Sequence, residues 1–176
     1  MSNWQYAPML PTRQFRSQNS LPRDLSLYTD DQGEYRVAVV PSAEAFTLRG
    51  NLTDQPSETS LIEVAGAPEG RKTVITLSND KGEKVVMTLD PSKKTFSMNR
   101  NHSGNVSFSK DFPAVTTAPL FVHRPSYTVR LFIDRCSIEA FDGEGAWAMT
   151  NLVFPSEPYN RVEVNGGTAT IYELNR

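Results

Sequence analysis

The sequence predicts an all-β protein: a two-sheet antiparallel β-sandwich of the jelly-roll or concanavalin-like type, preceded by an irregular N-terminal segment. Three observations predict this fold. No window of 11 residues keeps apolar side chains at the i, i+3, i+4, i+7 positions of a helix. Turn signals recur about every 8 to 12 residues. Between them lie some dozen short runs that are typical of strands, and such strands bury their apolar faces by packing two sheets together. We expect a connector over residues 1–24 and a sandwich domain over residues 25–176.

Length, charge and cysteine usage exclude several classes of protein. The 176 residues fit one ordinary domain. A formal net charge of -2, from 18 basic and 20 acidic residues, predicts no nucleic-acid partner and no membrane partner. No apolar run approaches the roughly 20 residues of a membrane helix, and the N-terminus lacks the layout of a signal peptide. The single cysteine, Cys136, excludes an internal disulfide and does not determine the compartment.

Residues 1–24 contain three prolines and no strand or helix periodicity, so we expect them to be an irregular connector. The segment nevertheless carries Trp4, Tyr6 and Phe15. Burying each of these side chains would contribute about 1.5 to 3 kcal/mol. We therefore expect the connector to pack against something.

The first half of the sandwich starts with a hairpin in which apolar residues alternate on both sides of a turn at 29–33, where Gly33 can supply a positive φ. A short run at 45–49 and an irregular stretch that includes residues 51–56 follow it. Turns at 66–70, 79–82 and 90–93 separate the next strands, at meander spacings. We predict these strands at 61–65, 73–77, 84–89 and 95–98.

The second half starts with a polar stretch at 99–109 and a proline-containing loop at 111–119. We predict the remaining strands at 120–123, 129–133, 138–141, 147–153, 161–164 and 168–174. The last two are predicted to form a hairpin around Asn165, Gly166 and Gly167, because Asn-Gly is the strongest short-range hairpin signal.

The central hairpin, residues 131–141, is the best-defined element of the sequence. If Arg135 and Cys136 form its two-residue loop, Ile133 faces Ile138 and Leu131 faces Ala140. One side of the hairpin is then entirely apolar and must be buried. The other side mixes charged and aromatic residues.

A glycosidase needs a pair of carboxyl groups about 5 to 9.5 Å apart, and the sequence contains acidic residues that could supply one. Asp134 and Glu139 are the first candidates, but their different parity leads us to expect their side chains on opposite faces of the hairpin. Other acidic residues lie in turns, where they form local hydrogen bonds. These are Asp30, Asp31, Asp142 and Glu144. We predict no catalytic pair.

Other site signatures are absent from the sequence, and we predict neither a cofactor nor a metal ion. His102 and His123 have no second His or Cys at ligand spacing, which favours hydrogen-bonded or solvated loop histidines. Three aromatic residues could form a sugar-stacking platform, although core packing is favoured for each. These are Trp147, Tyr159 and Tyr172.

Two parts of the chain carry a family resemblance. The strings MSNWQYAPMLPT and FRSQNSLPRDLSL resemble the segment that closes the catalytic domain of glycoside hydrolase family 32, the β-fructofuranosidases. The strings LDPSKKTFSMNRNHSGNVSFSKDF and VRLFIDRCSIEAFDGEGAWAMTNLVFP resemble that family's C-terminal sandwich. The chain departs from the family at Cys136, where a small hydroxyl residue is common, and at Phe15, where tryptophan is frequent.

The resemblance implies a parent enzyme in which a five-bladed β-propeller carries the active site and hydrolyses fructans or sucrose with retention. The motifs of the family's nucleophile, transition-state stabiliser and acid/base are absent from this sequence. The resemblance therefore implies a fragment without activity of its own, with the catalytic propeller of the same chain as partner. It also implies that Trp4 contacts the substrate in the parent enzyme.

Three functions remain open at this point. The first is a non-catalytic accessory domain that stabilises the catalytic propeller. The second is a carbohydrate-binding module that holds a fructan oligosaccharide, and the third is a structural or oligomerising domain. The parent's substrate and compartment are not determined, and a secreted or periplasmic parent is compatible with the sequence.

Overall fold

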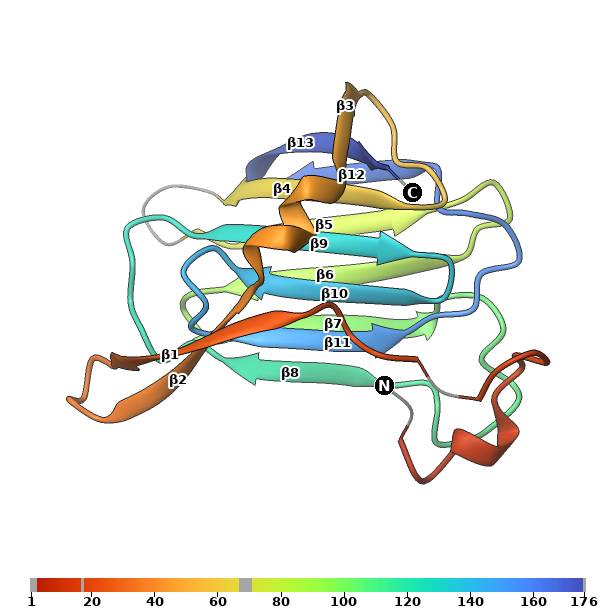
Figure 1. Cartoon of the computed structure of the whole chain (residues 1–176), viewed down its shortest axis with the longest axis horizontal. Coiled ribbons are helices and arrows are strands. Elements are labelled where there is room, and N and C mark those ends of the chain that lie inside the picture. Colours follow the sequence, from red (N-terminus) through yellow and green to blue (C-terminus); the bar gives the residue numbers. More distant parts are fainter. Residues whose placement is uncertain (1–2, 17, 67–70, 176) are drawn as a thin grey trace.

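The computed structural model describes residues 3–16, 18–66 and 71–175, and it confirms the predicted antiparallel β-sandwich (Figure 1). The six-stranded sheet has the order β11-β10-β9-β4-β13-β3, and the five-stranded sheet has the order β12-β5-β6-β7-β8. A separate two-stranded ribbon, β1-β2, projects from one side. The strands are β1 (Arg23–Thr29), β2 (Tyr35–Pro41), β3 (Arg49–Thr53), β4 (Ser60–Gly66), β5 (Thr73–Ser78), β6 (Lys84–Asp90), β7 (Thr95–His102), β8 (Val115–Pro119), β9 (Thr128–Asp134), β10 (Ser137–Asp142), β11 (Ala148–Leu152), β12 (Arg161–Asn165) and β13 (Gly167–Leu174). Two short 3-10 helices, η1 (Ala7–Met9) and η2 (Ala43–Leu48), complete the described elements.

The main core lies between the two sheets, where every second residue of each central strand points inward. The six-stranded sheet contributes Ile62, Val64, Val129, Leu131, Ile133, Ile138 and Ala140, and the five-stranded sheet contributes Ile75, Leu77, Val85, Met87, Leu89, Phe96 and Met98. A second cluster covers the outer face of the six-stranded sheet and joins η2 to Phe132 and Phe141. The sheet is therefore buried on both faces over β9 and β10.

The central hairpin has the predicted register. Ile133 pairs with Ile138 and Leu131 pairs with Ala140, and all four side chains are buried between the sheets. Arg135 and Cys136 form the loop, because Asp134 pairs with Ser137. The mixed side of the hairpin is also largely covered, since Phe132 and Glu139 are buried by η2 and by the N-terminal segment.

The expectation that Asp134 and Glu139 point to opposite faces is wrong. Across a two-residue loop, an even-numbered residue on one strand pairs with an odd-numbered residue on the other. Asp134 therefore pairs with Ser137 and Phe132 with Glu139, and all four side chains project from the same face of the sheet. Asp134 and Glu139 line one pocket on that face.

The predicted C-terminal hairpin is also wrong. Strand β12 pairs with β5 in the five-stranded sheet, whereas β13 pairs with β4 and β3 in the six-stranded sheet. The Asn165 to Gly167 turn therefore carries the chain from one sheet to the other. Gly166 has a φ of +76°, and a Cβ atom there would lie 2.3 Å from the Lys72 carbonyl oxygen.

Several other boundaries differ from the prediction. The polar stretch at 99–109 begins as the end of β7, and the predicted loop at 111–119 contains the edge strand β8, with Pro119 at its end, where no ladder donor is needed. The predicted strand at 120–123 is absent, because the chain leaves the sheet after Leu120. The run at 45–49 is mostly η2, and the stretch after it forms β3. Of the predicted turn at 66–70, residues 67–70 lie outside the described residues.

The predicted hairpin at 25–39 forms the β1-β2 ribbon, which we call the arm. Gly33 has a φ of +82° at its tip, as the turn requires. In Figure 1 the arm lies at the lower left and η1 lies at the lower right, so the two project on the same side of the sandwich.

Candidate functional site

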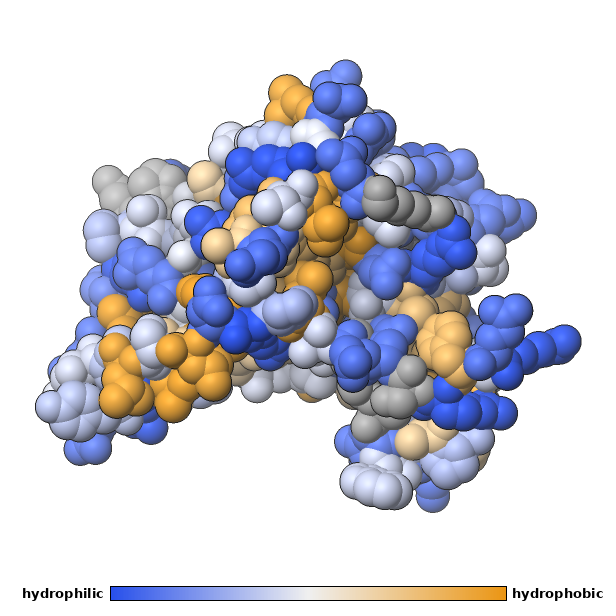
Figure 2. Space-filling view, in the orientation of Figure 1, coloured by the Kyte–Doolittle hydropathy of each residue, from blue (hydrophilic) through white to orange (hydrophobic). Residues whose placement is uncertain are grey.

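The outward face of the arm is apolar and open to solvent. Leu25, Leu27, Tyr35 and Val37 are 68%, 73%, 80% and 54% exposed, and the pairing of Leu27 with Val37 places them on one face. Figure 2 shows an orange, hydrophobic patch over the arm at the lower left of the molecule. Large contiguous apolar patches on a protein surface commonly mark sites of interaction with another molecule.

The arm is held in place at its tip and at its root. At the tip, the His123 amide donates to Asp31 Oδ2 (2.7 Å), and the Arg36 guanidinium lies 4.2 Å from the centre of the Phe121 ring. The Tyr28 hydroxyl, also near the tip, donates to the Ala146 carbonyl oxygen (3.2 Å), and nearer the root the Val39 amide donates to the Gly145 carbonyl oxygen (2.9 Å). The exposed apolar face is thus presented on a fixed support.

Asp30 organises the turn of the arm. Its Oδ1 accepts the amides of Gln32 and Glu34, both at 2.9 Å, and its Oδ2 accepts from Arg36 Nε at 2.9 Å. The hydrogen bond from Arg36, together with those from the two amides, lowers the pKa of the Asp30 carboxyl below its ordinary value.

The N-terminal segment divides into buried and exposed side chains. Tyr6 and Leu10 are buried in a cluster with Phe112 and Leu152, which confirms that part of the connector packs on the sandwich. Trp4, the predicted substrate contact, is 94% exposed. Met9 and Phe15 are also exposed, at 45% and 44%.

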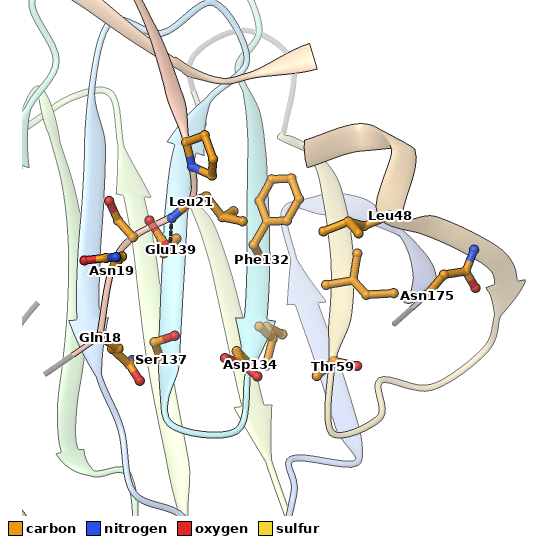
Figure 3. Close-up of a pocket in the computed structure, with 14 residues that line it drawn as sticks. Gln18, Asn19, Leu21, Leu48, Thr59, Phe132, Asp134, Ser137, Glu139 and Asn175 are labelled. Carbon is orange, nitrogen blue, oxygen red and sulfur yellow. Dashed lines mark hydrogen bonds between the residues drawn. The ribbon is translucent and has the colours of Figure 1, made fainter. Parts of the chain in front are cut away.

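A second anchor attaches the segment to the outer face of the six-stranded sheet. Glu139 Oε1 accepts the Leu21 amide (2.8 Å), and Oε2 accepts from Arg23 Nη2 (2.6 Å) and from the Thr150 hydroxyl (3.2 Å). Figure 3 shows the contact between Leu21 and Glu139 at the wall of a pocket of about 320 Å³. Asn19, Phe132, Asp134, Ser137 and Asn175 also line this pocket.

This environment makes Glu139 a structural carboxylate. Both of its oxygens are occupied by donors from the connector and from β11, and the residue is only 4% exposed. Asp134 Oδ1 accepts the Arg135 amide (2.8 Å). Although the two carboxylates share a pocket, Glu139 is committed to holding the connector.

The other predicted candidates lie apart from this pocket. Trp147 is buried and stacks on Phe96 with ring centroids 4.1 Å apart, and the buried Tyr159 donates to the Ser103 carbonyl oxygen (2.7 Å). Burial also raises the pKa of the Tyr159 hydroxyl. The core interpretation is therefore confirmed for both residues. Tyr172 is partly buried beneath Arg49.

The histidines and the cysteine do not form a site. His102 and His123 are exposed and far apart in the fold, at the end of β7 and beside the arm. The half-buried Cys136 thiol donates to Gln18 Oε1 (3.0 Å), and burial raises its pKa. Among the residues that the structure describes, no three His, Cys, Asp or Glu side chains could hold a metal ion, and no helix could cross a membrane.

A family model described as "Glycosyl hydrolases family 32 C terminal" matches residues 26–175. The chain belongs to this family, as its C-terminal domain. Both sheets and the inter-sheet core of this family 32 domain lie within the matched residues, and so does the arm from residue 26 onward.

Two curated relatives extend the match over nearly the whole chain. A levanase of Bacillus subtilis is 29% identical over 203 residues, covering 100% of this chain and 30% of the levanase. An extracellular exo-inulinase of Aspergillus awamori is 27% identical, covering 99% of this chain and 37% of the relative. The family 32 domain thus spans about a third of the length of the curated relatives it matches.

Solved structures agree on the fold. The crystal structure of the Aspergillus awamori exo-inulinase superposes with a TM-score of 0.84 at 24% identity, covering 99% of this chain and 39% of that one. The fructofuranosidase of Schwanniomyces occidentalis complexed with fructose superposes with a TM-score of 0.75 at 19% identity, over 99% and 44%.

Sequence reasoning missed two features of this family 32 domain. The alternation in the arm predicted strands, but period-2 alternation does not tell whether the apolar face is buried or free. Arg100, which contacts Tyr6 in the cluster of Tyr6, Leu10, Phe112 and Leu152, lies in a stretch whose sequence indicated only that it is polar. No local signal in the sequence identifies either feature.

Proposed function

We propose that this chain is the non-catalytic accessory domain of a retaining glycosidase that hydrolyses fructans or sucrose, and that it stabilises the catalytic propeller of the same polypeptide. The observation that carries the proposal is the rigid arm with its four exposed apolar side chains. Removing this apolar area from water contributes about 25 cal/mol per Å², which favours docking against a second apolar surface. The levanase and exo-inulinase similarities supply the substrate class.

The environment of the carboxylates supports the proposed lack of activity. Both Glu139 oxygens accept hydrogen bonds from the connector and from β11. A second pocket brings Glu58, Asp134 and Glu157 together, but Glu58 is paired with Arg135 and Glu157 with Lys81. The purified chain, incubated with sucrose, levan and inulin, should release no fructose. Turnover that survives purification would contradict this part of the proposal.

The docking surface can be tested with charged substitutions. Leu27→Arg should weaken binding to a separately produced catalytic propeller at least about tenfold, because it places a charge in an apolar contact. The matched control is Leu52→Arg on β3, which is 69% exposed and lies away from the arm. Calorimetric titration measures both. Equal affinities for the two variants would exclude the arm as the contact, and dimerisation of the free chain through the arm, seen by light scattering, would favour the oligomerising function instead.

Trp4 belongs to the same proposal as its substrate contact. We propose that in the complete enzyme the exposed indole packs against a fructosyl unit, since aromatic faces suit the apolar faces of sugars. Trp4→Ala in the complete enzyme should raise KM for sucrose and fructans. An unchanged KM would remove Trp4 from the site.

A second candidate, fructan binding by the domain itself, is favoured by the pocket beside Glu139. Its volume of about 320 Å³ lies in the range of ligand sites, with Phe132 on its apolar side and Asn19, Asp134 and Asn175 as polar groups. Titration with levan oligosaccharides should give heat that Asn175→Ala diminishes. Absence of heat at millimolar ligand would exclude this function.

A further inference from the structure

Arg100 is a buried cation at the junction between the N-terminal segment and the sandwich. It is 5% exposed, and no carboxylate among the described residues forms an ion pair with it. Its Nε donates to the Phe112 carbonyl oxygen (2.9 Å), its Nη1 to the Leu152 carbonyl oxygen (3.4 Å) and its Nη2 to the Tyr6 hydroxyl (3.3 Å). A buried charge held only by neutral acceptors is costly, so the contacts that surround it must be well ordered.

Aromatic rings complete the enclosure of Arg100. Its guanidinium carbon lies 4.2 Å from the centre of the Phe112 ring and 5.5 Å from the centre of the Tyr6 ring. Tyr6 in turn meets Phe112 edge to face, with centroids 5.2 Å apart at 87°. Ring faces attract desolvated cations, so Tyr6 is bound to Arg100 through both its hydroxyl and its ring.

Trp4 lies in a turn that is closed by a hydrogen bond between Asn3 and Tyr6. The Asn3 carbonyl oxygen accepts the amides of Tyr6 (3.2 Å) and Ala7 (2.8 Å), and Asn3 Oδ1 accepts the Gln5 amide (2.9 Å). Trp4 lies inside this turn, two residues before the buried Tyr6. The direction of its backbone is therefore determined by where Tyr6 is held.

We infer that Arg100 is a positioning residue: by holding Tyr6 against β7 and β11, it fixes the turn that presents Trp4 outside the sandwich. The sandwich then contributes to sugar recognition without touching the sugar. This inference rests on the proposed substrate contact of Trp4. It assigns the domain a part in substrate binding beyond stabilising its neighbour.

Hydrogen exchange of the chain itself tests the local part of the inference. Arg100→Met should accelerate exchange of the Ala7 amide, which donates within the turn, at least about tenfold, because the turn opens more often. The Leu21 amide, which donates to Glu139, should keep its rate. Arg23→Met is the matched control, since it removes an arginine from the second anchor and should accelerate Leu21 rather than Ala7.

Arg100→Lys provides a second test if Arg100→Met does not fold. Lysine keeps the charge but lacks the planar fork that reaches three acceptors, so exchange of Ala7 should accelerate to a smaller extent. Unchanged exchange of Ala7 in both variants would overturn the inference. Equal acceleration at Ala7 and Leu21 would also overturn it, because the effect would then be a general loss of stability.

Kinetics of the complete enzyme separate this inference from the function on which it rests. Trp4→Ala and Arg100→Met should each raise KM severalfold with kcat within about twofold, and the double variant should be no worse than Trp4→Ala. An effect of Trp4→Ala without any effect of Arg100→Met would overturn the positioning role and leave the substrate contact intact. No effect of Trp4→Ala would overturn the substrate contact, whatever Arg100→Met does to hydrogen exchange.

Discussion

Glu139 anchors the connector to the six-stranded sheet through hydrogen bonds from Leu21 and Arg23. Glu139→Gln should lower the free energy of unfolding by about 2 kcal/mol, because Arg23 loses its ion-pair partner, and only its hydrogen bond to Thr150 remains, while only 25% of its side chain is exposed. Urea denaturation measures the change. Glu58→Gln is the control: the ion pair of Glu58 with Arg135 is exposed on both sides, and its loss should cost less than about 1 kcal/mol. Equal losses would show that Glu139 contributes no more than a surface charge.

Asp30 gives the arm a pH dependence. Its pKa in the folded chain is below the ordinary value, because Arg36 and two backbone amides donate to the ionised carboxylate. The group thus stabilises the folded chain above the unfolded pKa of about 3.9, and this contribution is lost as the pH falls through the folded pKa. The gap in Tm between the natural chain and Asp30→Asn should be largest near neutrality and close below about pH 4. A gap that is constant from pH 3 to 7 would contradict this assignment.

At the level of the elements, sequence patterns predicted structure best where pairing is local. The central hairpin and the arm were predicted with their turns, because each strand's partner lies only a few residues away. The Asn165 to Gly167 turn looked equally local, yet β12 pairs with β5 and β13 pairs with β4, so each strand's partner lies far away in the sequence. For Asp134 and Glu139 the predicted register is correct, but the prediction that their side chains point to opposite faces of the sheet is wrong. Odd and even positions lie on the same face once the chain has crossed a two-residue loop.

Substitution of Gly166 tests how tightly the turn between the two sheets is packed. Gly166→Ala should lower the free energy of unfolding by more than about 2 kcal/mol, since it adds a close contact with the Lys72 carbonyl oxygen to an unfavourable φ. Gly33→Ala at the tip of the arm has a similar φ and nothing within 4 Å, so its cost should be about 1 kcal/mol. Thermal unfolding of both variants compares them, and equal costs would mean that the crossover is not tightly packed.

At the scale of the whole molecule, the candidate site could be predicted only in part. The family resemblance predicted Trp4 as a substrate contact, and the structure shows the hydrogen-bonded turn in which Trp4 lies. Arg100 is distant from Tyr6 in the sequence, and nothing about a polar stretch shows that its arginine is buried. Contacts of this kind depend on the completed fold, and so does the exposure of one face of the arm.

The folding unit includes part of the N-terminal segment. We predicted a connector over residues 1–24 that packs against something, and in the structure Tyr6 and Leu10 are buried against the sandwich and Leu21 is bonded to Glu139. A chain that starts at residue 11 should lose about 3 to 6 kcal/mol of unfolding free energy, because each lost apolar side chain contributes about 1.5 to 3 kcal/mol. A chain that starts at residue 6 loses the exposed Trp4 and keeps both anchors, so its stability should stay within about 1 kcal/mol. Urea denaturation of the two chains decides where the unit begins, since equal stability of both would place that start after residue 10.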